Sequence, residues 1–264
     1  MTEGGESEAP VQGYNESFSK VYNLRWSGWA VSTAPAIAAY YETIPVSKNN
    51  KYILDVCCGT GQLLAFFLER GYTGTGLDSS EHMLAYAKKN AGRHFRENKA
   101  DFIQADAADF RLKRGYGLAV STFDALNHVS GRNALRSCFF CVKAALAPGG
   151  CFIFDLNTRK GLSMWNGINV EETEELFILT RGIFGEGMKR AYHRTTGFMK
   201  TRGSSYERFE QTAYNTVFAM CEVMDDLAQC GFADVRAAGL KELGGSAPDP
   251  ESLTRVFFTA RNPS

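Results

Sequence analysis

The chain has 264 residues, 44% of them apolar, and its 29 basic residues balance its 29 acidic ones. This length suffices for the core of one large domain, and a net charge of zero disfavours nucleic acid or a membrane surface as partner. No apolar stretch is long enough to cross a bilayer, and no signal peptide opens the chain. Seven scattered cysteines do not suggest a disulfide framework, so we expect a reducing, cytoplasmic location.

The N-terminal region divides into a tail and an aromatic segment. Residues 1–13 are acidic, rich in glycine and almost free of large apolar side chains, which predicts a disordered tail. Phe18, Tyr22 and Trp26 then recur at intervals of four, so they share one face of a predicted helix. Two interpretations of that face stay open: packing into the core, or a helical lid over a ligand site within residues 14–45.

Strands and helices alternate from Tyr52 onward. The predicted strands cover residues 52–58, 72–78, 100–106, 118–123 and 151–157. The predicted helices between them cover residues 62–70, 79–90 and 133–150, the last ending in a Pro-Gly-Gly stop. Because parallel neighbours need a crossover connection, this order predicts an α/β fold with a doubly wound, mostly parallel sheet.

The pattern changes after the fifth predicted strand. Longer runs of β-branched and aromatic residues, separated by glycine-containing turns, cover residues 174–184, 188–199 and 205–218. They predict an antiparallel β-meander, inserted at 165–218. A predicted helix and two predicted strands close the chain, at 221–232, 233–240 and 253–261. We therefore expect a single domain over residues 14–264 that carries this insertion.

The stretch "ILDVCCGTGQLL", residues 53–64, joins the first strand to the first helix of this alternating pattern. Gly59 and Gly61 leave bare backbone amides at a helix N-terminus, which suits a nucleotide-like ligand. Leu64 stands where the dinucleotide fingerprint has its third glycine, so a nicotinamide-dependent oxidoreductase is disfavoured but stays an alternative.

The cysteines raise a second alternative, a bound metal. Cys57 and Cys58 are adjacent in the glycine turn, and Cys138 and Cys141 lie one turn apart within a predicted helix. No second Cys-x-x-Cys pair stands at a matching distance, so we expect the helical pair to pack in the core and no metal to bind.

Three acidic residues lie at or near the ends of three successive predicted strands. Asp55 lies inside the first strand, Asp78 ends the second and Asp106 follows the third. A carboxylate at Asp55 would repel a pyrophosphate but suits a positively charged ligand. Asp78 can accept hydrogen bonds from the hydroxyls of a ribose, and Asp106 from the amino group of an adenine. Their joint placement at the ends of neighbouring strands predicts an adenosyl ligand with a cationic centre.

These segments resemble the motifs of a known family. "LDVCCGTGQ", "GLDSSEHML" and "QADAADF" are similar to the first three motifs of class I S-adenosylmethionine-dependent methyltransferases, and "STFDALNHV" and "LAPGGCFIFDLNT" to the next two strand regions. The resemblance covers roughly residues 50–160, and is greatest to the small-molecule branch that methylates sugars and amines. It implies a seven-stranded, Rossmann-like sheet whose last strand, near 253–260, is antiparallel, and S-adenosylmethionine as cofactor.

The resemblance also implies which residues contact the cofactor. Gly59 and Gly61 would leave space for its methionine part, Asp55 would lie near its amino group, and Asp78 would hold its ribose. The other implied contacts are Tyr14 and Tyr22 at the methionine carboxylate, Trp26 at the wall of the site, Cys57 beside the turn, Ser79 after the ribose acid, Met83 on one adenine face, Asp106 with the Ala107 amide at the adenine edge, and the Ser121 carbonyl at the amino group. Arg25 is a second candidate for the carboxylate, and for Met83 core packing is the alternative.

His128 is the candidate general base. It follows the fourth predicted strand, near the point where the methyl group would lie, and a protonated amine or a hydroxyl acceptor must lose a proton. Members of the family that act on amino sugars carry a histidine at the matching position. The alternative is a structural histidine at the start of a helix.

The inserted meander is the expected place of acceptor specificity. Its candidate polar side chains, and the tryptophan that precedes it, are Tyr192, His193, Arg194, Arg202 and Trp165; for each of them a solvated strand face or a dimer contact is the alternative. Asp155 and Asn157 end the fifth strand and suggest a divalent-metal pair only weakly.

The sequence thus predicts a methyltransferase that modifies a nitrogen or oxygen of a small-molecule acceptor, in secondary metabolism. The Asn/Asp-Pro-Pro-aromatic motif of nucleic-acid methyltransferases is absent after the fourth strand. A homodimer stays open, and a non-catalytic cofactor-binding module is a further alternative.

Overall fold

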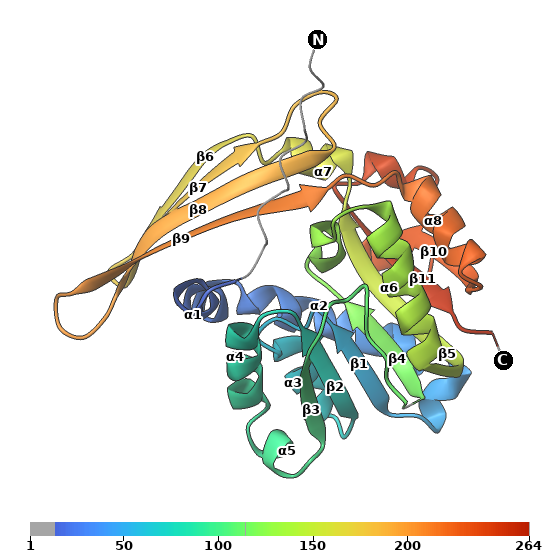
Figure 1. Ribbon diagram of the computed structural model, residues 1–264. Helices are drawn as coiled ribbons and strands as arrows, with labels where there is room; N and C mark the ends of the chain where they lie inside the picture. Colours follow the sequence, from blue (N-terminus) through green and yellow to red (C-terminus); the bar gives the residue numbers. More distant parts are fainter. Residues whose placement is uncertain (1–13, 114, 264) are drawn as a thin grey trace.

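The computed structural model describes residues 14–113 and 115–263. A twisted central sheet with helices on both faces forms the body of the molecule, and a long second sheet extends from it above α1 (Figure 1). The tail predicted at residues 1–13 lies outside the described residues.

The central sheet has seven strands. In spatial order they are β10 (Ala233–Ala238), β11 (Arg255–Arg261), β5 (Leu146–Asn157), β4 (Tyr116–Ser121), β1 (Tyr52–Val56), β2 (Thr73–Asp78) and β3 (Ala100–Gln104). Only β11 runs antiparallel to its neighbours, β5 and β10. The strand order reverses between β1 and β4, so a crevice opens at their carboxyl ends, as in other doubly wound folds. The predicted fold class is confirmed.

Eight α-helices are described. They are α1 (Glu16–Arg25), α2 (Ser27–Glu42), α3 (Gln62–Leu68), α4 (Glu81–Ala91), α5 (Arg93–Arg96), α6 (Arg132–Ala145), α7 (Arg159–Ser163) and α8 (Met220–Gln229), and short 3₁₀ turns include η1 (Pro45–Lys48) and η2 (Ala125–His128). No helix in residues 14–113 or 115–263 has both the length and the apolarity needed to cross a membrane.

Two apolar clusters form the core, one on each face of the central sheet. Leu54 points to the face covered by α6 and α8, where Phe139, Phe154 and Phe258 pack. Ile53, its neighbour, points to the face covered by α2 and α3. This alternation along β1 makes the strand apolar on both faces, as a buried parallel strand must be.

The inserted meander is a four-stranded antiparallel sheet of β6 (Gly167–Glu172), β7 (Leu176–Ile183), β8 (Arg190–Lys200) and β9 (Tyr206–Thr216). The sequence predicted the last three strands but missed β6. Ile168 and Val170 on β6 are 68% and 53% exposed, so this edge strand lacks a buried apolar face. Phe18 and Val21 of α1 pack with Ile178 and Phe209, which holds the meander above α1.

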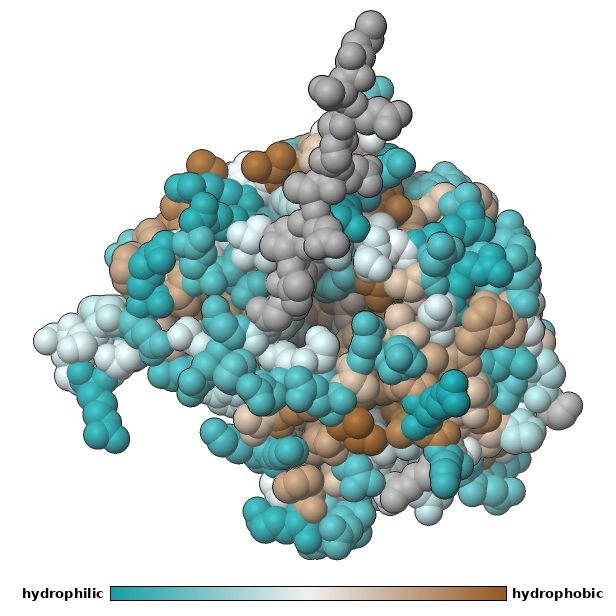
Figure 2. Space-filling model, in the orientation of Figure 1, coloured by the Kyte–Doolittle hydropathy of each residue, from teal (hydrophilic) through white to brown (hydrophobic). Residues whose placement is uncertain are grey.

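Two helix boundaries differ from the predictions. The aromatic segment forms two helices, α1 and α2, which meet at Trp26. Helix α6 ends at Ala145, before Pro148, and the Pro-Gly-Gly segment belongs to the start of β5. On the face seen in Figure 2, hydrophilic residues cover most of the surface and apolar residues are scattered among them.

Candidate functional site

A cavity of about 880 Å³ lies between the carboxyl ends of the central strands, α1 and the meander. All the predicted cofactor-binding residues except Asp55, Gly61 and Ser121 line it, and so does His128. One half is formed by the ends of β1, β2 and β3 and by α4. The other half is formed by η2, the residues after α7 and the meander.

The aromatic face of α1 both packs against the meander and lines the cavity, so core packing and a place at the cavity are compatible, and the role as a lid stays a prediction. Phe18 belongs to the apolar cluster with the meander, and it lines the cavity beside Tyr14, Tyr22 and Trp26. The Asn15 side chain caps α1 by accepting a hydrogen bond from the Phe18 amide at 2.9 Å. Burial raises the pKa of Tyr14 and Tyr22, so both phenols stay protonated and can donate hydrogen bonds.

The glycine turn is tied to the end of β2 by Asp78. One carboxylate oxygen of Asp78 accepts from the Gly59 amide and the other from the Ser80 amide, both at 2.9 Å. Gly59 has a φ of +53°, and a Cβ there would lie 3.6 Å from the Tyr22 ring at the cavity wall. Asp78 thus positions the turn and lines the cavity, where a ribose acid was expected.

Gly61 is required where α3 begins to pack against α4, whereas the sequence resemblance implied that it leaves space for a cofactor. Its φ is +78°, and a Cβ there would lie 2.8 Å from the Cβ of Ala87 in α4. The missing side chain therefore allows α3 and α4 to pack closely, and Gly61 does not line the cavity. Gly59 does line the cavity, and the contacts of both glycines with a cofactor stay predictions.

Asp55 lies beside the cavity, in a small adjoining pocket that it lines with Trp26, Trp29 and Thr122. The side chain is 2% exposed, and its Oδ2 atom has no hydrogen-bond partner among the described residues. Burial, reinforced by the charge of Asp78, raises the pKa of Asp55 to about 8. An orphaned carboxylate oxygen in such a place fits the ammonium group of a ligand.

The raised pKa of Asp55 predicts a pH-dependent stability cost. In the unfolded chain Asp55 ionises near its ordinary 3.8, whereas in the fold it stays protonated up to about 8, so stability falls as pH rises across that window. We expect Asp55→Asn to be more stable than the native protein by roughly 5 kcal/mol at pH 8, since each pKa unit corresponds to about 1.4 kcal/mol, with the difference vanishing near pH 4. Thermal unfolding without cofactor at both pH values measures this; equal stability at pH 8 would contradict it.

The predicted adenine contacts gather at the ends of β2 and β3. Ser79, Met83, Asp106 and Ala107 all line the cavity. Met83 is fully buried and also lines the cavity, so core packing and a ligand contact are compatible there. One oxygen of Asp106 accepts from the Ala108 amide at 2.8 Å, which orients this exposed carboxylate.

The end of β4 differs from the predicted arrangement in one residue. Ser121 does not line the cavity, and its buried hydroxyl has no hydrogen-bond partner among the described residues. Thr122 and Phe123, which follow it, line the cavity instead. The contact of the Ser121 carbonyl with a cofactor stays a prediction.

His128 ends η2 and lines the cavity. Its ring packs edge-on against Tyr14, with ring centroids 6.4 Å apart, and hydrogen bonds with the Tyr214 backbone. Burial lowers the pKa of His128, although Asp124, 4.0 Å from Nε2, counteracts this. A neutral imidazole in this position can accept a proton.

The remaining candidates separate into two groups. Trp165 and His193 line the half of the cavity formed by η2 and the meander, with their rings in edge contact at 5.1 Å between centroids. Arg194 forms an ion pair with Glu210, and Arg25 forms one with Glu171 at 2.5 Å. Neither arginine lines the cavity. Tyr192 and Arg202 also lie outside the lining. For Tyr192, Arg194 and Arg202 the solvated-face and dimer-contact alternatives stay open, and the carboxylate contact of Arg25 stays a prediction.

A polar cluster that was not predicted from the sequence lies beneath His128. Asp124 and Arg255 line the cavity and form an ion pair with N–O distance 2.7 Å. Asp155 also pairs with Arg255 and accepts backbone hydrogen bonds, and the Asn157 amide donates to Asn127. The available signals were the charged Arg255 at the start of an apolar strand and the residues Asp124, Asn127 and His128 within one short segment.

No three His, Cys, Asp or Glu side chains gather as metal ligands within the described residues. Cys138 packs in the core as predicted, and Cys141 lies at its edge.

The strands and helices that form one side of the cavity match a known protein family. The family described as "Methyltransferase domain" matches residues 53–150, which span β1 to the start of β5. The chain carries a methyltransferase domain. S-adenosylmethionine, the cofactor that the sequence resemblance implies, is the group that the residues of this cavity have to fit.

Relatives share more than this segment. A putative methyltransferase of Bacillus subtilis, YqeM, is 24% identical to this chain over 94% of each of the two chains. The dTDP-3-amino-3,4,6-trideoxy-alpha-D-glucopyranose N,N-dimethyltransferase of Streptomyces venezuelae is 33% identical over 39% of this chain and 41% of its own. A solved S-adenosylmethionine-dependent methyltransferase of Clostridium acetobutylicum has the same fold, with TM-score 0.76 and 20% identity over 94% of this chain and 98% of its own.

The residues of the cavity fit this cofactor. Asp55 offers an unpartnered buried oxygen for an ammonium group, Gly59 leaves the turn open toward the cavity, and Asp78 presents a carboxylate at the expected place of a ribose. S-adenosylmethionine supplies a methyl group on a positively charged sulfur, which a nucleophile can displace in line. Alignment of the acceptor and exclusion of water are then the tasks of this chain's residues.

Proposed function

We propose that the methyltransferase transfers a methyl group to the amine nitrogen of a small hydroxylated acceptor bound under the meander, with His128 as general base. The observation that carries the proposal is the position of His128, a partly exposed imidazole with lowered pKa that lines the same cavity as the predicted cofactor contacts and the meander. A general base must be unprotonated at the working pH and within reach of the acceptor's proton.

The lining of the cavity under the meander supports a small, hydroxylated acceptor without an anionic group. The meander contributes Asn169, Thr180, His193, Thr195 and Tyr214 to it, and Trp165 adds an aromatic wall. Burial lowers the pKa of His193 to about 4, so this ring is also neutral. Neutral hydrogen-bonding groups beside an aromatic ring suit a hydroxylated ring compound better than an anion.

An amine fits this base better than an alcohol. A histidine with lowered pKa is a weak base, and an alkyl ammonium group gives up its proton far more readily than an alkyl hydroxyl does. The amine, once neutral, is itself the nucleophile. The similarity to a relative named as an amino-sugar N,N-dimethyltransferase supports the same choice.

The test compares matched acceptors. Purified full-length protein is incubated with S-adenosylmethionine and with pairs of sugars that differ only in an amino group against a hydroxyl at one position. We expect methylated product, measured by mass spectrometry, from amino sugars alone. Methylation of the hydroxyl partner at an equal rate would contradict the choice of nitrogen.

A further inference from the structure

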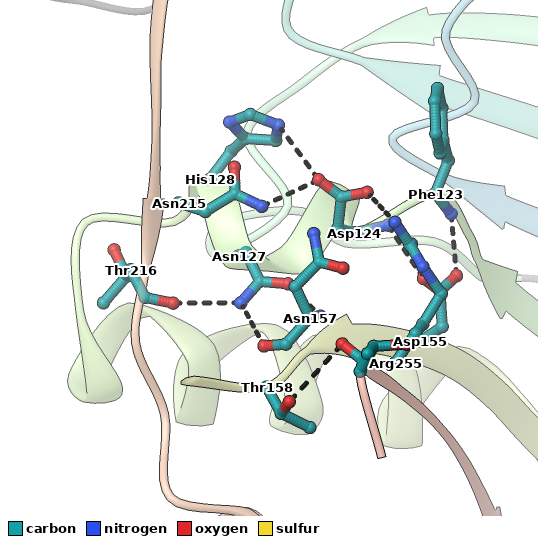
Figure 3. Close-up of polar contacts among 11 residues, drawn as sticks. Phe123, Asp124, Asn127, His128, Asp155, Asn157, Thr158, Asn215, Thr216 and Arg255 are labelled. Atoms are coloured by element: carbon teal, nitrogen blue, oxygen red, sulfur yellow. Dashed lines mark hydrogen bonds and ion pairs between the residues drawn. The ribbon is translucent and has the colours of Figure 1, made fainter. Parts of the chain in front are cut away.

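Asp124 lies at the centre of a buried polar cluster beneath His128 (Figure 3). Its Oδ1 accepts from Arg255 at 2.7 Å, and its Oδ2 accepts from the Asn215 side chain at 2.7 Å. The same Oδ2 lies 4.0 Å from Nε2 of His128. The Asp124 carboxylate thus faces the histidine while its charge is shared with a guanidinium.

The backbone at this point is held in an unusual conformation. Phe123 and Asp124 have φ values of +67° and +50°, which side chains other than glycine rarely adopt. Asp155, fully buried in β5, accepts hydrogen bonds from both of their amides, at 2.7 and 2.9 Å. Arg255 also pairs with Asp155, so one guanidinium joins both carboxylates.

Asn127 links the same turn to the meander. Its side-chain amide donates to the carbonyl oxygens of Thr216 in β9 and Asn157 in β5, and its oxygen accepts from the Asn157 amide at 2.9 Å. The first helical turn after β4 is thereby fixed to both sheets, and His128 is the last residue of that turn.

We propose that Arg255 is a positioning residue: by pairing with Asp124 and Asp155, it fixes the turn that carries His128 and masks the Asp124 charge, which keeps His128 neutral. Its functional meaning rests on the proposed role of His128 as base. An unmasked carboxylate at this distance would favour the protonated imidazole, which cannot accept a proton.

Groups from other helices and strands also affect the protonation of His128. Tyr14 of α1 and Tyr214 of β9 contact the ring, and His193 of β8 interacts with it electrostatically. Asp155 of β5 and Arg255 of β11 act on it through Asp124 and the backbone of its turn. Among these side chains only Asp155 and Arg255 carry a charge at neutral pH, and they are paired with each other. Asp124 and Arg255 are therefore the groups whose removal should change the protonation of His128 most.

The test is the titration of His128 by NMR in the full-length protein, which has four histidines. Asp124→Asn removes the negative charge beside the ring, so we expect the midpoint to move to lower pH by about one unit. Arg255→Gln removes the masking cation, so we expect a shift to higher pH. Arg255→Lys keeps the cation and should leave the midpoint near the native one.

Arg136→Gln is the matched control, because Arg136 pairs with the buried Asp226 away from the cavity, at 3.0 Å. It should destabilise the fold without moving the His128 midpoint. Unchanged midpoints in Asp124→Asn and Arg255→Gln, or shifts in the same direction, would overturn the proposal. If Arg255→Gln does not fold, Arg255→Met, which also removes the cation but keeps a long side chain, carries the same test: an upward shift supports the proposal and an unchanged midpoint overturns it.

The NMR readout separates this inference from the proposed function. If Asp124→Asn and Arg255→Gln shift the His128 midpoint in opposite directions but His128→Asn keeps full activity, the inference about Arg255 stands and the role of His128 as general base is refuted. If His128→Asn loses activity but neither Asp124→Asn nor Arg255→Gln shifts the midpoint, the general base stands and the role of Arg255 is refuted.

Discussion

His128→Asn is expected to lower kcat for methyl transfer by about 10² to 10⁴-fold, with little change in the affinity for S-adenosylmethionine. Asparagine keeps a polar side chain in the cavity but cannot accept the proton of an ammonium group. Single-turnover rates and calorimetric cofactor titrations, made on the same preparation, measure the two quantities separately.

His82→Asn is the matched control, because His82 lies on α4 with a side chain that is 40% exposed and does not line the cavity. It should leave both quantities unchanged. A His128→Asn enzyme with native kcat would show that His128 is a structural histidine at the end of η2.

The pH dependence of kcat follows from the same residue. Burial lowers the pKa of His128 below its ordinary 6.5, so the base is neutral at pH 7 and becomes protonated only in more acidic solution. Activity is therefore expected to fall on the acid side, below pH 6.5, and this acid limb should be missing from the residual activity of His128→Asn.

Asp78→Ala is expected to weaken S-adenosylmethionine binding by about 100-fold. The substitution removes a carboxylate that lines the cavity and accepts two charge-assisted hydrogen bonds, one from the Gly59 amide in the glycine turn and one from the Ser80 amide after β2. Each such bond contributes about 1.5 to 3 kcal/mol. Cofactor affinity measured by calorimetry tests this.

Two variants make the result interpretable. Asp78→Asn keeps the shape and one acceptor oxygen, so its affinity should lie between those of the native protein and Asp78→Ala. Asp225→Ala removes an exposed carboxylate from α8 and should bind the cofactor as the native protein does. Native affinity in Asp78→Ala would show that the ribose is held elsewhere.

The parts of the site that could be predicted from the sequence are those encoded within a few residues. The glycine turn, the acid that ends β2 and the aromatic face of α1 each follow from local periodicity and turn chemistry, and all three meet at the cavity. They meet because carboxyl ends of parallel strands share one edge of the sheet.

The features that could not be predicted depend on residues distant in the chain. Arg255 reaches Asp124 across 131 positions, because β11 inserts antiparallel between β5 and β10. The reason for Gly61 appears only when α4 brings Ala87 within 2.8 Å of the absent Cβ. Strand β6 has exposed apolar residues and is specified by pairing with β7 rather than by burial.

The most direct test of the account is calorimetric titration of the full-length protein with S-adenosylmethionine, its demethylated product and NAD in parallel. We predict binding of the first two at one shared site, shown by competition, and no binding of NAD. Binding of NAD without binding of S-adenosylmethionine would contradict the account.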